Sequence, residues 1–288
     1  MGEIGLGSPP APGSEASRGA ASGQGTPQRK IGPLQEPSNS RQFPRSRIEP
    51  AMSLSPAIAL AALANNPWFE ALPREVRERL VAEAQDVHLQ PGGQLFRQGD
   101  PADHWFAIVR GALYISRIGI DGREHVFALV EPGDWFGETG ILTHSLHLST
   151  GIAREAAHVL AVPGSVFQEL MHTSVDFARA IAELVAHRGR RISESFSGSA
   201  IRPAVVRVAQ RLLLLLRGDA AHVPRNRTTV TIAQEVFARM LGISRQALSE
   251  ELQKMSRNGL IRIGYRNIEI LDETGLQEIA SGGDTEQR

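Results

Sequence analysis

Residues 232–255 have the pattern of two short amphipathic helices joined by a single glycine. Apolar residues recur at helical spacing on both sides of Gly242, so each half must bury one face against a shared core. Glycine suits the left-handed residue that ends a helix, and Ser244 can cap the next helix by accepting a backbone N–H. The spacing therefore predicts a helix, a tight turn and a second helix.

The second helix leaves a polar face opposite its apolar stripe, with Arg245 and Gln246 at its N-terminal end. In a helix-turn-helix, this end meets base edges in the major groove. Arginine can bond O6 and N7 of guanine together, and glutamine can bond N6 and N7 of adenine. We therefore expect this unit to read DNA. Its expected contact residues are Ser244, Arg245, Gln246, Ser249, Glu250 and Gln253.

The residues after this helix pair predict a β-hairpin. Asn258-Gly259 is a turn signal, and the β-rich runs 260–263 and 268–271 flank a second turn at 264–267. A hairpin directly after a recognition helix is the wing of a winged helix-turn-helix. We add its tip residues, Tyr265 and Arg266, to the expected DNA contacts.

Charge is unevenly distributed along a chain that is neutral overall, with 31 basic and 31 acidic residues. Residues 202–271 hold twelve basic against five acidic residues, a net +7, whereas residues 52–201 hold twelve against seventeen, a net −5. A basic segment suits phosphate contact and counterion release. The acidic segment argues against nucleic acid as a partner of the N-terminal part.

The first 51 residues are rich in glycine, proline and serine and have no sustained periodicity, so we expect a disordered tail. Alternatively, the stretch is a misassigned start and folded character begins at Met52. No run reaches the roughly 20 apolar residues of a membrane span. The absence of cysteine fits a reducing compartment and excludes a cysteine-ligated iron–sulfur cluster. We expect a soluble, cytoplasmic protein with no membrane partner.

Short β-rich runs alternate with glycine turns between residues 86 and 163. Many short strands at regular spacing predict a sandwich or barrel, and this length suits a small jelly roll. We expect residues 52–172 to form a jelly-roll effector domain with flanking helices. The β-rich runs are 86–90, 94–97, 105–110, 112–117, 124–130 and 158–162.

A sustained helix is expected over residues 174–197, and Arg188-Gly189 interrupts its apolar stripe. Its apolar stripe is close to heptad spacing, which suits either a cover for the barrel or pairing with a second copy of the helix. The arginines on the helix favour a homodimer. Paired recognition helices would lie about one DNA turn apart, as a palindromic operator requires. The stripe consists of Phe177, Ile181, Leu184, Val185, Ile192 and Phe196.

These patterns divide the chain into a tail, an effector domain, a dimerisation helix at 173–200, a winged helix-turn-helix at 201–275 and a flexible tail at 276–288. Pro203 disfavours helix for the residue before it, so residues 199–203 are expected to form a hinge. The expected fold class is α+β.

Three motifs in this order resemble the family of the cyclic-AMP receptor protein and the fumarate–nitrate regulator: LFRQGDPADHWFAIVRGALYIS at 95–116, PGDWFGETGIL at 132–142 and LGISRQALSEELQKM at 241–255. The resemblance covers roughly residues 66–271. It implies a cyclic-nucleotide-binding-like sensor and a DNA-binding transcription regulator rather than an enzyme, with double-stranded DNA and RNA polymerase as partners. It also implies base contacts from Arg245, Gln246 and Ser249. Many relatives carry arginine at the position of Glu250, so the resemblance does not predict that this chain reads the same operator sequence as they do.

The effector site departs from the family pattern. Its cyclic-nucleotide binders use Gly-Glu for the ribose and Arg-Ser about ten residues later for the phosphate, and here Gly137 and Glu138 are present but Leu148 replaces the arginine. Arg154 lies too far along the chain to substitute. We therefore expect an unidentified effector rather than cyclic AMP bound in the usual way, and we interpret Glu138 as a turn carboxylate that caps backbone amides. The expected pocket residues are Gly137, Glu138, Thr139, Leu148, Ser149, Ile192 and Ser193.

Other functions were weighed against this interpretation. A cyclic-nucleotide response is one alternative, and haem or metal sensing through His144 and His147 is another, but no cysteine or suitably spaced carboxylate accompanies the two histidines. A cupin-like enzyme would need more histidines converging with Glu138. A third alternative is a nucleotide-sensing module that acts on a protein partner. We expect no catalytic residue, no metal site and no cofactor.

Overall fold

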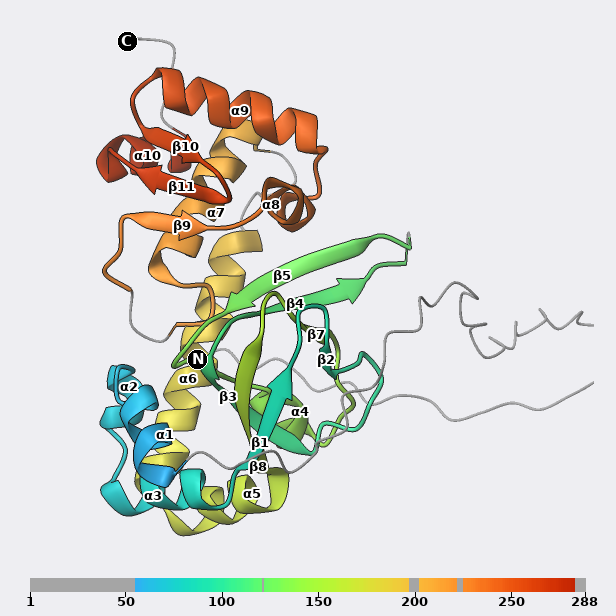
Figure 1. Ribbon diagram of the computed structural model, residues 1–288, viewed down its shortest axis with the longest axis vertical. Coiled ribbons are helices and arrows are strands. Elements are labelled where there is room, and N and C mark those ends of the chain that lie inside the picture. The colour runs from blue at the N-terminus through green and yellow to red at the C-terminus, as the bar shows by residue number, and fades with distance from the viewer. Residues whose placement is uncertain (1–54, 121, 197–201, 222–224, 283–288) are drawn as a thin grey trace, which may run out of the picture. The chain divides into compact units, whose positions relative to one another are not determined.

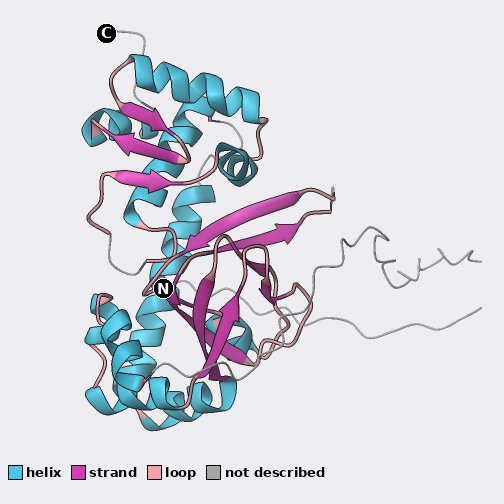
Figure 2. Cartoon of the chain, in the orientation of Figure 1, coloured by secondary structure: helices cyan, strands magenta, loops and turns pink. Residues whose placement is uncertain are grey.

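Two antiparallel sheets form the first part of the chain (Figures 1 and 2). The computed structural model describes residues 55–120, 122–196, 202–221 and 225–282, without the side chains of 192–196. The strands are β1 (Gln85–Leu89), β2 (Gln94–Phe96), β3 (His104–Arg110), β4 (Leu113–Ile118), β5 (Glu124–Val130), β6 (Trp135–Phe136), β7 (Thr150–Ala153) and β8 (Ala157–Pro163). One sheet has the order β1-β8-β3-β6 and the other β2-β7-β4-β5.

The inner faces of the two sheets share one apolar core. Val87, Ile108 and Val159 of the first sheet belong to the same buried cluster as Phe96 and Leu113 of the second. This arrangement is the jelly roll that the glycine-spaced runs predict, and the fold class is confirmed. Strands β6 and β7 were not predicted, because two to four residues are too few to show a period.

Helices cover the outer face of the first sheet. Leu160 of β8 and Trp105 of β3 belong to a buried cluster that the helices complete. The Trp105 ring lies edge-on to Phe167 and Phe177, with centroids 5.2 and 5.7 Å away. The helices are α1 (Pro56–Leu63), α2 (Pro67–Glu70), α3 (Arg74–Ala82), α5 (Gly164–Thr173) and α6 (Val175–Phe196), and α4 (Glu138–Thr143) lies between β6 and β7.

Helix α6 runs through Arg188 and Gly189, the two residues that interrupt its apolar stripe. Three residues of its apolar stripe, Phe177, Ile181 and Leu184, are buried in the cluster beneath the helices of the jelly roll. This half of the stripe therefore covers the barrel. The side chains of 192–196 and the expected hinge at 199–201 lie outside the described residues, as does the expected N-terminal tail. No helix in the described part of the chain is both long and apolar enough to cross a membrane.

The C-terminal part is a winged helix-turn-helix whose sheet has three strands in the order β10-β11-β9. The third strand was not predicted, and residues 276–280, expected as flexible tail, belong to a helix that buries Leu276 and Ile279. That expectation is therefore wrong for these residues. The elements are α7 (Ala204–Arg217), β9 (Thr229–Thr231), α8 (Gln234–Leu241), α9 (Arg245–Arg257), β10 (Ile261–Gly264), β11 (Asn267–Ile270) and α10 (Glu273–Ala280).

The turn between α8 and α9 has the predicted chemistry. Gly242 ends α8 in the left-handed conformation, with φ 63°, where a side chain would be strained. Ser244 caps α9, its hydroxyl accepting from the amide of Ala247 at 3.1 Å. Phe237 of α8 and Leu248 of α9 are fully buried in one core, so the two helices pack as a unit.

Strand β5 of the jelly roll and helix α8 share part of this core. Val126 and Leu129 of β5 belong to the same buried cluster as Phe237. At the other end of β5, Glu124 forms an ion pair with Arg239 of α8 at 2.6 Å. The jelly roll therefore contacts the first helix of the helix-turn-helix pair, α8, through both apolar and charged groups.

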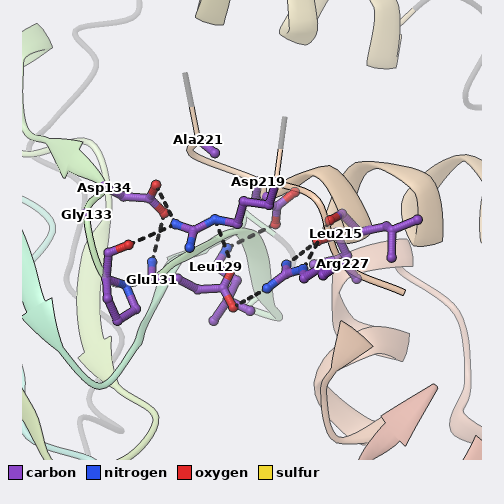
Figure 3. Close-up of polar contacts among 12 residues, drawn as sticks. Leu129, Glu131, Gly133, Asp134, Leu215, Asp219, Ala221 and Arg227 are labelled. Carbon is purple, nitrogen blue, oxygen red and sulfur yellow. Dashed lines mark hydrogen bonds and ion pairs between the residues drawn. The ribbon is translucent and has the colours of Figure 1, made fainter. Parts of the chain in front are cut away.

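Buried acidic side chains reinforce this contact (Figure 3). Arg227 donates to Glu131 at 2.8 Å and also to the carbonyls of Leu215 and Leu216 at the end of α7. Asp219 accepts from the amide of Leu129 at 3.0 Å. The end of β5 and the residue that follows it are thereby bonded to Asp219 and Arg227 respectively.

Asp134, in the segment after β5, is a buried carboxylate whose pKa is shifted. Its side chain is 1% accessible and accepts from Arg225 at 2.8 Å and from the amide of Glu131 at 2.8 Å. Burial raises the pKa of Asp134 to about 6, although the charge of Arg225 opposes the shift. Between pH values of about 4 and 6, the carboxyl group of Asp134 therefore stays protonated in the folded protein but loses its proton in the unfolded chain.

Replacing Asp134 with asparagine will test this assignment. Because the folded-state pKa is raised, the stability contributed by Asp134 is present at low pH and is lost as the pH rises toward 6. Relative to Asp134→Asn, the wild type should lose about 3 kcal/mol of unfolding free energy across this window, at about 1.4 kcal/mol per pKa unit. Urea unfolding of both proteins at several pH values measures the difference. Asp176→Asn, which removes an exposed carboxylate, is the control, and a difference for Asp134→Asn that does not change with pH would contradict the raised pKa.

Candidate DNA-reading surface and effector pocket

The N-terminal end of α9 presents the polar face that the sequence predicts. Arg245 and Gln246 are exposed, and Gln246 donates to Glu250 one turn later at 3.1 Å. Ser249 is half-buried and Gln253 is exposed. The structure therefore brings the predicted residues of this helix onto one accessible surface.

Burial of the opposite face holds this surface in place. Leu248, Leu252 and Met255 are at most 1% exposed and belong to the core shared with α7 and α8. Arg207 of α7 donates to the carbonyl of Leu241, which the end of α8 leaves without a helical partner. The polar residues of α9 are thus carried by a helix whose position is set by packing.

The wing contributes a second exposed group. Tyr265 is 87% exposed, and the guanidinium of Arg266 lies 5.6 Å from the centroid of its ring. Arg266 is in the left-handed region with φ 54°, and its carbonyl accepts from the amide of Ile232 at 2.9 Å. This bond ties the tip of the wing to the segment before α8. Below the tip, Arg262 pairs with Glu269 at 2.6 Å across the hairpin.

The basic residues of α9 differ in their partners. Lys254 pairs with Glu251 at 2.9 Å. Arg245 has no ion pair with any residue that the structure describes. An exposed guanidinium without an internal partner is available for an external acceptor.

The expected effector pocket is built around Glu138, which begins α4 and is 2% exposed. Gly137 precedes it with φ 99°, and a β-carbon there would approach Phe106 to 3.1 Å, so the position requires glycine. Arg188 of α6 donates to one carboxylate oxygen of Glu138 and to the carbonyl of Trp135. The interpretation of Glu138 as a turn carboxylate is therefore wrong, because its partner is a cation from the long helix.

The second carboxylate oxygen of Glu138 is buried and has no hydrogen-bond partner among the described residues. An unsatisfied buried acceptor is costly unless a ligand or water completes it. A hydroxyl donor fits this position chemically. Arg188 was missed as a pocket residue because, as one of the arginines on α6, it suggested only a dimer contact.

The other expected pocket residues do not gather around Glu138 in this way. Thr139 is exposed, and its carbonyl accepts from Thr143 at 2.7 Å. Leu148 is 64% exposed and Ser149 is half-buried. Ile192 and Ser193 lie on α6, but their side chains are outside the described residues. Arg154 donates to the carbonyl of Thr231 at 2.9 Å and is therefore engaged elsewhere.

His144 and His147, the two histidines considered for haem or metal sensing, each have a place in the fold that does not involve Glu138. His147 is 8% exposed and stacks on Phe96 with centroids 3.9 Å apart, and burial lowers its pKa. His144 follows α4 in the left-handed conformation, with φ 50°. It lines a surface depression with Ala102, Asp103 and Gln168, to which Glu138 does not contribute.

Comparison with known proteins agrees with this architecture. A family model described as a cyclic nucleotide-binding domain matches residues 86–174, and one described as a Crp-like helix-turn-helix domain matches residues 206–279. The chain is 27% identical to the cyclic AMP receptor protein of Thermus thermophilus over 217 residues, which cover 75% of this chain and 98% of that protein. The structure of FixK2 from Bradyrhizobium japonicum aligns with a TM-score of 0.60 and 22% identity, covering 68% of this chain and 96% of that one.

A further relative is similar enough to establish the family of this chain. The HTH-type transcriptional regulator Cmr of Mycobacterium tuberculosis is 31% identical over 206 residues, which cover 72% of this chain and 80% of that protein. This relative and the matched family models agree with the order of jelly roll, long helix and winged helix-turn-helix in the structure. The chain therefore belongs to the family of the cyclic-AMP receptor protein and the fumarate–nitrate regulator.

Proposed function

We propose that this protein is a homodimeric, effector-controlled transcription regulator that reads a palindromic operator, with RNA polymerase as a partner in the cytoplasm. The observation that carries the proposal is the exposed polar face of α9, where Arg245 has no ion pair with any described residue. The family supports the same function, since its curated relatives are named as transcription regulators.

Three polar residues on α9 have a chemical counterpart on a base edge. Arg245 suits guanine, and Gln246 suits adenine. Glu250 accepts from Gln246 in the free protein, and a carboxylate at a base edge accepts from the N4 amino group of cytosine. Because Glu250 also repels phosphates, we propose that it faces the bases rather than the DNA backbone.

Arg245→Ala is expected to relax specificity at one base position in each half-site. The lost bidentate contact should cost about 1–3 kcal/mol on the preferred operator and much less on sequences that already differ at that base. Selection of bound fragments from genomic DNA, followed by binding titrations on matched and altered operators, measures both effects. An unchanged preference at every position would contradict the proposed placement of the recognition helix.

Arg257→Ala provides the matched control on the same helix. Arg257 is exposed at the C-terminal end of α9, away from the end that enters the groove. Any phosphate contact that it makes should weaken binding to all sequences alike. The two variants therefore separate base reading from general attraction to DNA.

Exposed apolar side chains support the homodimer. Val185 remains 40% exposed on α6, next to the residues that cover the barrel. On the hairpin of β4 and β5, Ile118 is 58% exposed and Phe127 is 53% exposed. We propose that these exposed apolar side chains of α6 and of the hairpin meet a second copy of this chain.

We also propose that the effector binds Glu138 through a hydroxyl group and is not cyclic AMP bound in the usual way. The unsatisfied oxygen of Glu138 supports the hydroxyl donor. Leu148, which is exposed and uncharged, occupies the position where the family resemblance requires an arginine for the cyclic phosphate. A leucine cannot neutralise a phosphate, and loss of such a buried pair costs on the order of 2–5 kcal/mol.

Calorimetric titration with cyclic AMP will test this pocket. The wild type is expected to show no binding in the micromolar range, and Leu148→Arg is expected to improve affinity by about thirtyfold or more, as a restored charge pair requires. Leu146→Arg is the control, because Leu146 is an exposed leucine of the same loop, 54% accessible. Micromolar binding of cyclic AMP by the wild-type protein would contradict the proposal.

A further inference from the structure

Three side chains with metal-binding chemistry gather on β1 and β8, outside the elements that build the Glu138 pocket. Asp86 and His88 alternate along β1 with Val87 and Leu89, which are buried in the jelly-roll core. They therefore project from the outer face of the sheet. His158 of β8 lies directly opposite His88 in the antiparallel register.

Packing around β8 explains why the cluster is sheltered. On the same face of β8 as His158, Leu160 and Val162 are buried beneath the helices. The side chains of His158 and Asp86 are 10% and 9% exposed, whereas His88 is exposed. Two of the three groups are thus held in place, and the third faces solvent.

The three groups already contact one another. Nε2 of His158 and Oδ1 of Asp86 are hydrogen-bonded. The rings of His88 and His158 stack with centroids 4.2 Å apart and planes 17° from parallel. One ligand atom from each residue lies within 4.8 Å of the other two, and this is the one such trio among the residues that the structure describes.

This donor set selects a class of metal ion. Two imidazoles and a carboxylate suit zinc and neighbouring transition metals, whereas calcium and magnesium prefer oxygen ligands throughout. Bonds of about 2.0–2.1 Å in a tetrahedral site separate the ligand atoms by roughly 3.4 Å. The atoms must therefore converge by little more than an ångström, and the exposed His88 side chain is placed to make most of that movement.

The geometry points to a binding site for a divalent transition metal ion, with Zn²⁺ as the reference ion, formed by Asp86, His88 and His158 with the fourth position left to water. The ion cross-links β1, the edge strand of its sheet, to β8 at the centre. Because none of the three residues belongs to the Glu138 pocket or to the DNA-reading surface, the ion acts by stabilising the jelly roll.

The test uses the full chain without an affinity tag, freed of metal by chelation and then desalted. Calorimetric titration with Zn²⁺ is expected to show one saturable ion per chain, and bound Zn²⁺ should raise the melting temperature. Co²⁺, used as a spectroscopic probe, should give the visible absorption of a four-coordinate site with nitrogen and oxygen ligands.

His88→Ala is the informative variant, because His88 is exposed and its loss leaves the core intact. It should weaken Zn²⁺ binding by at least about tenfold and abolish the rise in melting temperature. Asp86→Asn keeps a hydrogen-bonding group beside His158 but removes the anionic ligand, and it should also weaken binding. His172→Ala, at an exposed histidine of α5 that bonds only the carbonyl of Gln168 in the described structure, is the matched control and should bind as the wild type does.

Two results would overturn the proposal. The first is an absence of saturable Zn²⁺ binding by the wild type. The second is binding that His88→Ala and Asp86→Asn leave unchanged, which would place the ion at another histidine of the chain.

Discussion

Residues 131–138, which include β6 and the first residue of α4, form a segment that is held at both ends by arginines from outside the sheets. Arg225 bonds Asp134 and the carbonyl of Pro132, and Arg227 bonds Glu131, all from the DNA-binding part. At the other end, Arg188 of the long helix bonds Glu138 and the carbonyl of Trp135. Glu138, where we propose that the effector binds, and the contact with the DNA-binding part therefore lie at two ends of the same eight-residue segment.

This arrangement gives a ligand at Glu138 a physical means to act at a distance. A group that occupies the free oxygen of Glu138 changes the charge and hydrogen bonding that Arg188 meets. Since the carbonyl of Trp135 also accepts from Arg188, a shift of that guanidinium acts directly on the backbone of β6. Allosteric control needs two arrangements with different ligand affinity, and a segment held by opposed charges is a suitable place for them.

Local signals explain which parts of the structure could be predicted from the sequence. The turn at Gly242, the cap at Ser244 and the wing hairpin each depend on a few adjacent residues, and all three were located correctly. The longer strands of the jelly roll were located because their length shows the β pattern. The apolar stripe of α9 likewise predicted which of its faces is buried.

The features that could not be predicted depend on contacts between distant residues. Arg188 reaches Glu138 across 50 positions, so neither residue alone indicates the pair. His158 meets Asp86 across 72 positions and only because β1 and β8 pair in one register. The burial of α10 follows from the core of the DNA-binding part, which no short segment of sequence reveals.

Helices α8 and α9 share one core but present different surfaces to their surroundings. Helix α8 faces β5, through the apolar cluster with Val126 and the ion pair of Arg239 with Glu124, whereas the polar end of α9 is exposed. Close packing between Phe237 and Leu248 means that the two helices respond to force as one body. In the proposed dimer, a displacement of β5 would therefore move α8 and α9 together and change where Arg245 lies. The spacing of the two recognition helices would then decide whether they fit successive turns of DNA.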